Sequence, residues 1–199
     1  MFAGCTETGT KSKSKSETKA ASTDSTEASA SADETENNTT DTGGKTMVVY
    51  FSATGNTKGV AEKIASVADA DTYEITAAQP YTSDDLNYND NNSRSTKEQN
   101  DKSVRPEIGS NKIKLDGYDT VYIGFPIWWG EEPRIMDTFV ESYDFTGKTV
   151  IPFCTSGSSP ISTAEENLKA NAGSGEWKDG RRFAADASTT EIEEWINTL

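Results

Sequence analysis

The feature that most restricts the fold of this chain is a change of hydrophobic period within MVVYFSATGNTKGVAEKIA, residues 47–65. Residues 47–51 form an uninterrupted apolar run, typical of a parallel strand that is buried on both faces. After the polar segment SATGNT, apolar side chains return at helical spacing at Val60, Ile64 and Val67. Because neighbouring parallel strands need a crossover connection, which is usually a helix, this unit favours an α/β fold.

The same alternation of apolar runs and helical periodicity continues to the end of the chain. Four further strands are predicted, at residues 71–76, 120–125, 148–154 and 180–184. Strands joined by helices form right-handed βαβ units, which place helices on both faces of the sheet. We therefore predict an α/β fold with a doubly wound, five-stranded parallel sheet in the order 2-1-3-4-5.

Several residues mark where the remaining helices should begin. A helix is expected to begin at Pro133, because the fixed φ of proline suits the first helical position. Ser162 and Glu165 have the spacing of a capping box at the start of the next helix. The last helix is predicted to begin near residues 188–190, and a short helix is predicted over residues 95–102.

Large apolar side chains are almost absent from residues 6–45, which consist mainly of Ser, Thr, Lys, Glu, Asp, Ala and Gly. Such a segment cannot bury enough surface to offset the entropy of ordering it, so residues 1–45 are predicted to hold a disordered tether. Residues 46–199 carry every Trp and nearly every Leu, Ile and Val, and are predicted to form the folded domain.

The chain has a formal net charge of −14 and contains no histidine. A chain this acidic is expected to be repelled by nucleic acids and anionic lipids. The lack of histidine excludes His-based catalytic triads, metal sites and proton shuttles. No apolar run approaches the length of about 20 residues that a membrane-spanning helix requires.

The two cysteines lie in different surroundings. Cys154 falls in the apolar run TVIPFCTS and is expected to be an inert core residue. Cys5, in MFAGCTETG, resembles the end of a bacterial lipoprotein signal. We expect Met1 to be an internal methionine of a longer precursor and Cys5 to carry a lipid anchor, which would hold the protein on the extracytoplasmic face of a bacterial membrane. The alternative is a chance AGC sequence in a cytoplasmic protein.

Three loops of unusual composition follow the first, third and fourth predicted strands: residues 52–57, 126–131 and 155–159. In a doubly wound sheet ligands bind beyond the carboxyl ends of the strands, so these loops are expected to meet. SATGNT leads into a helix N-terminus, where unpaired N–H groups and the helix dipole favour an anion. The pyrophosphate motifs G-x-G-x-x-G and G-x-x-x-x-G-K-[ST] are absent, which favours a phosphate monoester. The alternative is an ordinary polar turn.

The other two loops favour a flat ligand. Two adjacent tryptophans, Trp128 and Trp129 in PIWWGEEP, expose apolar surface on which an aromatic ring could stack. The alternative, that the indoles only cover the core, is expected for at least one of them. TSGSS leaves room for a ring edge and supplies backbone N–H groups. Glu131 and Glu132 are expected to be a solvated helix start, and Arg181 and Arg182 to pair with carboxylates.

The chain from residue 46 onwards resembles the flavodoxin family, and in particular short bacterial flavodoxin-like proteins. SATGNT follows the flavodoxin phosphate-loop pattern [ST]-x-T-G-x-T, and GFPIWWG, FVESYDFTGKTVIPFCTSG and RRF are similar to segments of that group. The resemblance implies a bound FMN whose phosphate lies in the first loop and whose ring stacks on Trp128 or Trp129. The implied cofactor-binding residues are Ser52, Ala53, Thr54, Gly55, Asn56, Thr57, Pro126, Ile127, Trp128, Trp129, Gly130, Thr155, Ser156, Gly157, Ser158 and Ser159.

The family often places a second aromatic residue in the loop after the fourth strand, which has none here. Tyr81 or Tyr88, in the polar stretch 79–111, is the candidate cover. The resemblance implies a monomeric electron carrier that uses FMN to pass electrons between redox partner proteins, with no catalytic side chain of its own. Two alternatives are an FMN-dependent NAD(P)H:quinone or acceptor reductase and an anchored binding module without flavin.

Overall fold

The computed structural model describes residues 44–199. The predicted anchor Cys5 and nearly all of the predicted tether lie outside the described residues. Within them, six strands form one sheet in the order β2-β1-β3-β4-β5, and β6 also pairs with β4. The strands are β1 (Lys45–Phe51), β2 (Asp71–Ile75), β3 (Tyr118–Pro126), β4 (Thr149–Thr155), β5 (Glu176–Trp177) and β6 (Arg181–Phe183). Every pair is parallel, which confirms the predicted doubly wound order.

The edge strand of the sheet is divided into two pieces. The predicted strand at residues 180–184 appears as β6, which pairs with the end of β4. β5 pairs with the start of β4 and was not predicted, because it has only two residues and no apolar run. Lys45, which the prediction placed in the tether, is the first residue of β1.

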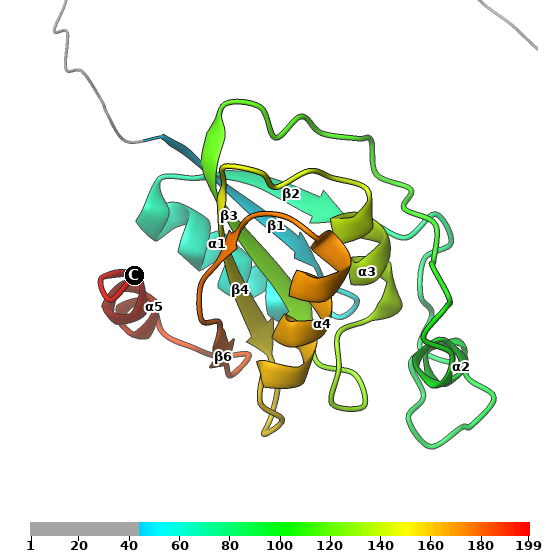
Figure 1. Ribbon diagram of the computed structural model, residues 1–199. Helices are drawn as coiled ribbons and strands as arrows, with labels where there is room; N and C mark the ends of the chain where they lie inside the picture. Colours follow the sequence, from blue (N-terminus) through cyan, green and yellow to red (C-terminus); the bar gives the residue numbers. More distant parts are fainter. Residues whose placement is uncertain (1–43) are drawn as a thin grey trace, which may run out of the picture. The chain divides into compact units, whose positions relative to one another are not determined.

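Five helices accompany the sheet in the described part of the chain: α1 (Asn56–Ala68), α2 (Arg94–Asn100), α3 (Arg134–Glu141), α4 (Ser162–Ala172) and α5 (Thr189–Ile196). α1 packs with α5 and α3 packs with α4, so the helices form two layers on opposite faces of the sheet (Figure 1). α2 belongs to the long connection between β2 and β3 and lies apart from both layers (Figure 1). No helix among residues 44–199 is long and apolar enough to cross a membrane.

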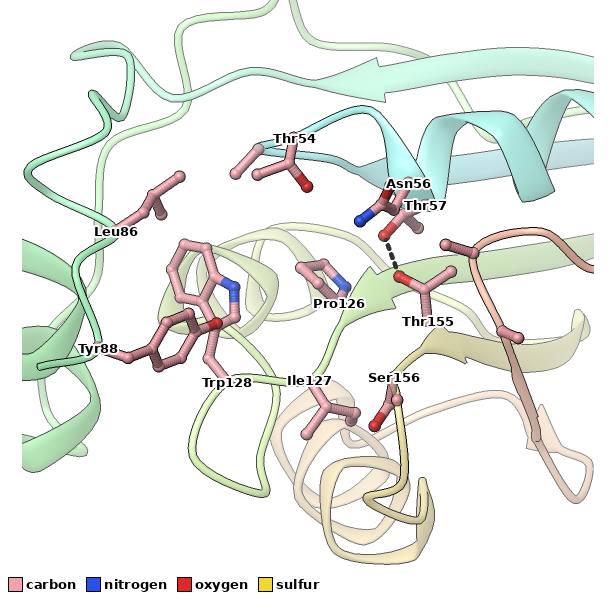
Figure 2. Close-up of a pocket in the computed structure, with 14 residues that line it drawn as sticks. Thr54, Asn56, Thr57, Leu86, Tyr88, Pro126, Ile127, Trp128, Thr155 and Ser156 are labelled. Atoms are coloured by element: carbon pink, nitrogen blue, oxygen red, sulfur yellow. Dashed lines mark hydrogen bonds between the residues drawn. The ribbon is translucent and has the colours of Figure 1, made fainter.

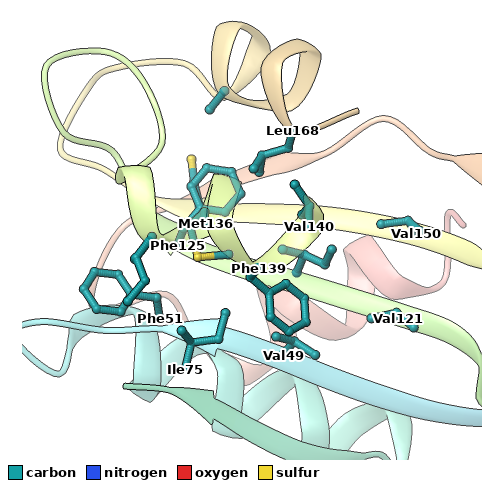
Figure 3. Packing of buried hydrophobic residues seen from close by; sticks show 14 of the residues in the cluster. Val49, Phe51, Ile75, Val121, Phe125, Met136, Phe139, Val140, Val150 and Leu168 are labelled. Carbon is teal, nitrogen blue, oxygen red and sulfur yellow. The ribbon is translucent and has the colours of Figure 1, made fainter. Parts of the chain in front are cut away.

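Each face of the sheet buries its own apolar cluster. On the α3–α4 face, Phe139 and Leu168 pack over Val49, Val121 and Val150 of three neighbouring strands (Figure 3). The other face is closed by α1 and α5, which bury Val60, Ile64, Ile192 and Trp195 and partly bury Val67 and Ile196. Burial on both faces explains why the central strands read as continuous apolar runs.

Two of the predicted helix starts need correction. Pro133 is the residue before α3, so the helix begins one position later than predicted. The capping box at Ser162 is wrong: Glu165 accepts a hydrogen bond from the Gly180 N–H instead of bonding back to its own helix start. A side-chain cap of this kind occurs at α5, where Ser188 accepts from the Glu191 N–H at 3.1 Å.

The expectation of a solvated acidic start for α3 is also wrong. Glu132 and Asp137 are buried, and both lie against the buried guanidinium of Arg134 at 3.0 and 3.4 Å. Arg134 also pairs with Glu131, which Lys102 approaches from the solvent side at 2.8 Å. One buried arginine therefore contacts three carboxylates, so the two buried ones, Glu132 and Asp137, are only partly compensated.

This crowding shifts the pKa values of the carboxyl groups in opposite directions. Burial, together with the nearby Asp137 carboxylate, raises the pKa of Glu132 to about 7. Burial likewise raises the pKa of Asp137. Glu131 is more exposed and receives hydrogen bonds from Lys102 and Arg134, which hold its pKa below the usual value. The cluster therefore takes up a proton at Glu132 well above the pH at which a free carboxyl group does.

The stability of Glu132→Gln relative to wild type should increase as pH rises from 4.5 to 7.5. Folded Glu132 keeps its proton up to about pH 7, whereas the unfolded side chain loses it near 4.5, so the wild-type protein loses stability as pH rises through this window. The difference in unfolding free energy between E132Q and wild type should grow by on the order of 3 kcal/mol across the window.

Urea unfolding at pH 4.5, 6 and 7.5 measures this difference. Glu166→Gln, on the exposed side of α4, is the matched control and should show no comparable trend. A constant or falling difference for E132Q would contradict the assignment of a raised pKa.

Candidate functional site

Residues from all three predicted loops line a single cavity beyond the carboxyl ends of β1, β3 and β4. Its volume is about 510 Å³, within the range of small-molecule sites. The lining residues are Ala53, Thr54, Asn56, Thr57, Leu86, Tyr88, Pro126, Ile127, Trp128, Thr155, Ser156, Gly157, Ala184 and Ala185. Figure 2 shows hydroxyl and amide side chains at one end of the cavity and aromatic side chains at the other.

The polar end of the cavity is the start of α1. Gly55 precedes the helix with φ 87°, a left-handed conformation that glycine adopts without steric cost, and no side chain caps the helix. The Ser52 hydroxyl accepts from the Lys58 N–H at 3.2 Å. Among residues 44–199, the N–H groups of Gly55, Asn56 and Thr57 have no hydrogen-bond partner. These groups are free to bind an anion that enters the cavity.

Among the described residues, no lysine or arginine lines this end of the cavity. The Lys58 ammonium is paired with Glu74 at 2.9 Å, and neither residue belongs to the lining. An anion here would therefore be bound by N–H dipoles, hydroxyl groups and the amide of Asn56.

One hydrogen bond joins the third loop to the first, and two more join the third loop to β6. The hydroxyl groups of Thr57 and Thr155, both buried, lie 2.7 Å apart and join the start of α1 to the end of β4 (Figure 2). The Ser156 N–H donates to the Phe183 carbonyl at 3.1 Å, and Arg182 donates to the Ser156 carbonyl at 2.8 Å. The predicted pairing of the two arginines with carboxylates holds for Arg181, which contacts Glu191 at 3.3 Å.

The aromatic end has an inner and an outer layer. Trp128 is 3% exposed, lines the cavity and meets Phe51 and Tyr81 edge-on at centroid distances of 5.8 and 5.2 Å. Trp129 is 41% exposed, does not line the cavity, and stacks on Tyr88 at 4.4 Å. Of the two tryptophans, the structure therefore presents Trp128 to a ligand.

The two candidate cover residues have different positions. Tyr88 lines the cavity beside Leu86 (Figure 2). Tyr81 lies behind Trp128, and its hydroxyl donates to Glu98 at 2.6 Å. Burial and the Glu98 carboxylate raise the pKa of Tyr81, so it remains a neutral phenol that supports the indole.

No residue among the described lining is a carboxylate, a lysine, an arginine or a cysteine. Cys154 is buried beneath the cavity wall, and burial raises the pKa of its thiol to about 12. The thiol stays protonated at neutral pH and is not a nucleophile. The cavity can bind and orient a ligand, but its own side chains offer little acid–base or covalent chemistry.

Some predicted site residues do not reach the cavity. These are Ser52, Gly55, Trp129, Gly130, Ser158 and Ser159. Ser52 and Gly55 shape the start of α1, and Trp129 and Gly130 form an outer turn. Sequence reasoning did not find Leu86, Ala184 and Ala185, which line the cavity from the polar connection and from the segment after β6. These three residues are small or isolated apolar residues and belong to no sequence motif that would mark them as part of a site.

The chain matches known flavoproteins over the described region. The family that matches residues 45–199 is that of flavodoxin. A putative flavoprotein from Bacteroides uniformis is 50% identical, with a TM-score of 0.74, and the match covers 78% of this chain and 99% of that one. A putative flavoprotein from Bacteroides eggerthii is 44% identical, with a TM-score of 0.73, over 78% and 98% of the two chains.

A more distant structure shares the fold. A flavoprotein from Lactobacillus acidophilus, solved in complex with FMN, is 23% identical with a TM-score of 0.59, over 77% of this chain and 99% of that one. No curated protein matches the chain. Since the family match covers most of the sequence and includes every strand of the sheet, the chain belongs to the flavodoxin family.

Proposed function

We propose that this protein binds FMN and carries electrons between redox partner proteins. The observation that carries the proposal is the cavity itself, which joins an uncapped helix start to an aromatic wall and has no charged side chain among its described lining residues. FMN has a terminal phosphate and a flat ring, which match the two ends of the cavity. The family match and the FMN complex of the L. acidophilus flavoprotein support the same cofactor.

The residues of the cavity have distinct roles in this proposal. The free N–H groups of residues 55–57, with Thr54 and Asn56, hold the phosphate without a counter-cation. Trp128 and Tyr88 border the ring and keep water from its faces, while Ser156 and Gly157 line an edge. The bound flavin supplies the redox chemistry by accepting and returning electrons. Because the chain is strongly acidic, its field disfavours a gain of negative charge in the cavity.

The cellular setting is a further part of the proposal. We propose that the protein acts as a monomer, that Cys5 is lipidated, and that residues 6–45 let the domain reach its redox partners near the outer face of the membrane. The AGC sequence before the tether and the composition of the tether support this arrangement.

Thr54→Val should weaken FMN binding about tenfold to a hundredfold, because it removes one hydroxyl that donates to a charged phosphate. Thr54 is exposed, so the substitution should leave the stability of the domain nearly unchanged. Titration of the apoprotein with FMN and with riboflavin, followed by flavin fluorescence, measures the effect.

Riboflavin has no phosphate, so T54V should bind it as well as the wild-type protein does. Thr72→Val, on the exposed edge strand β2, is the matched control. Failure of the wild-type protein to bind FMN would refute the proposed function, and an equal loss of FMN and riboflavin affinity in T54V would refute the phosphate assignment.

Anaerobic kinetics should distinguish the carrier from a reductase. With FMN bound, NADH or NADPH should reduce a quinone at less than about 0.1 s⁻¹, since typical enzymes turn over near 10 s⁻¹. The same holoprotein, once reduced with dithionite, should pass electrons rapidly to ferricyanide. NAD(P)H-driven turnover near 10 s⁻¹ would favour the reductase and contradict the carrier.

A further inference from the structure

We propose that Gln99 is a positioning residue of the flavin site, which clamps the turn that follows Trp128 and thereby sets the affinity and reduction potential of the cofactor. The inference rests on the proposed function, because it assigns a role at the same cavity. Gln99 lies on α2, in the connection between β2 and β3, and does not line the cavity.

The turn has a conformation that needs support. The Trp128 N–H donates to the Glu131 carbonyl at 2.9 Å and the Glu131 N–H to the Trp128 carbonyl at 3.0 Å. The two residues between them, Trp129 and Gly130, have φ of 49° and 85°. Two left-handed residues closed by a pair of hydrogen bonds define a tight type I′ turn. Left-handed φ is rare for a residue as bulky as tryptophan, so the surrounding contacts must hold it there.

Gln99 supplies such contacts at both ends of the turn. Its buried amide nitrogen donates to the Trp128 carbonyl at 2.9 Å and to the Glu132 carbonyl at 3.1 Å. With the amide reversed, its oxygen would face two carbonyl oxygens, so the donor orientation is the one the site accepts. A single side chain therefore holds both Trp128, which borders the cavity, and Glu132, which belongs to the buried charge cluster.

The clamp is itself anchored by the charge cluster. Arg134, at the centre of that cluster, donates to the backbone carbonyl of Gln99 at 3.4 Å. Arg134 is buried and paired with Glu131 and Glu132, so this contact limits the movement of Gln99. Gln99 can therefore impose its position on the turn.

Loss of the clamp should affect the ligand through Trp128. A freed turn can relax from its left-handed conformation, and the Trp128 backbone and indole would move with it. Reduction changes the charge and the hydrogen-bonding groups of a flavin ring. A protein with a looser turn should therefore differ from wild type in its ratio of affinities for oxidised and reduced cofactor. The change should therefore alter the potential as well as the dissociation constant.

Gln99→Met keeps the length of the side chain and removes both hydrogen bonds. In the FMN-loaded protein we expect about tenfold weaker FMN binding and a changed midpoint potential. A tenfold change in the preference for oxidised over reduced FMN displaces a two-electron potential by about 30 mV. Fluorescence titration gives the affinity, and anaerobic equilibration with a dye of known potential gives the midpoint.

Ser95→Ala is the matched control, because it removes one buried hydrogen bond from the same helix without touching the turn. It should lower Tm but leave affinity within twofold and the potential unchanged. If Q99M fails to fold, Gln99→Asn replaces it, since it keeps the amide but is one methylene too short to reach both carbonyls.

The outcomes separate this inference from the proposed function. If the wild-type protein binds FMN and the Gln99 variant has unchanged affinity and potential, the proposed role of Gln99 is refuted. The proposed function would still stand. An equal shift in S95A would also overturn it, because the effect would then follow from helix stability alone. Failure of wild type to bind FMN would refute both.

Discussion

The rest of the site depends on how α1 begins. Gly55 turns the chain in a left-handed conformation, no side chain caps the helix, and the N–H groups of residues 55–57 are left without partners in the described structure. The hydrogen bond between Thr57 and Thr155 then fixes this start against the end of β4. A helix start left without a cap in this way offers an uncharged site for an anion. Its strength comes from backbone dipoles that need no reorganisation on binding.

The buried charges at the start of α3 add little to the stability of the fold, but they hold neighbouring segments in place. Replacing a buried ion pair with apolar side chains is often neutral or stabilising, so the cluster around Arg134 is weak evidence for stability. It does, however, bring Glu131, Glu132 and the backbone of Gln99 to one point. The turn beside the cavity is thus held by a polar network, whose directional bonds fix positions more sharply than apolar contacts do.

The sequence was sufficient for the central sheet and for the meeting of three loops, because continuous apolar runs and helical periodicity follow directly from two-faced burial. It was insufficient where the outcome depended on distant partners. Glu132 looked like a solvated helix start because the residues that bury it, among them Asn167, are far away in the chain. Likewise, Trp128 and Trp129 are adjacent and look equivalent in the sequence. Only the turn between β3 and α3 buries Trp128 and leaves Trp129 exposed.

The polar connection between β2 and β3 is the clearest case in which the role of a residue depends on distant partners. Its composition suggests a solvated loop, yet it contributes Leu86 and Tyr88 to the cavity wall and Gln99 to the turn beside it. None of these residues belongs to a motif, since each acts through a contact with the loop after β3. Because the proposed phosphate site depends on the sheet and the first loop, variation in this connection could change how the proposed ring site is shaped without disturbing the fold. A segment without regular sequence pattern is therefore the part of this molecule best placed to set the properties of its cofactor.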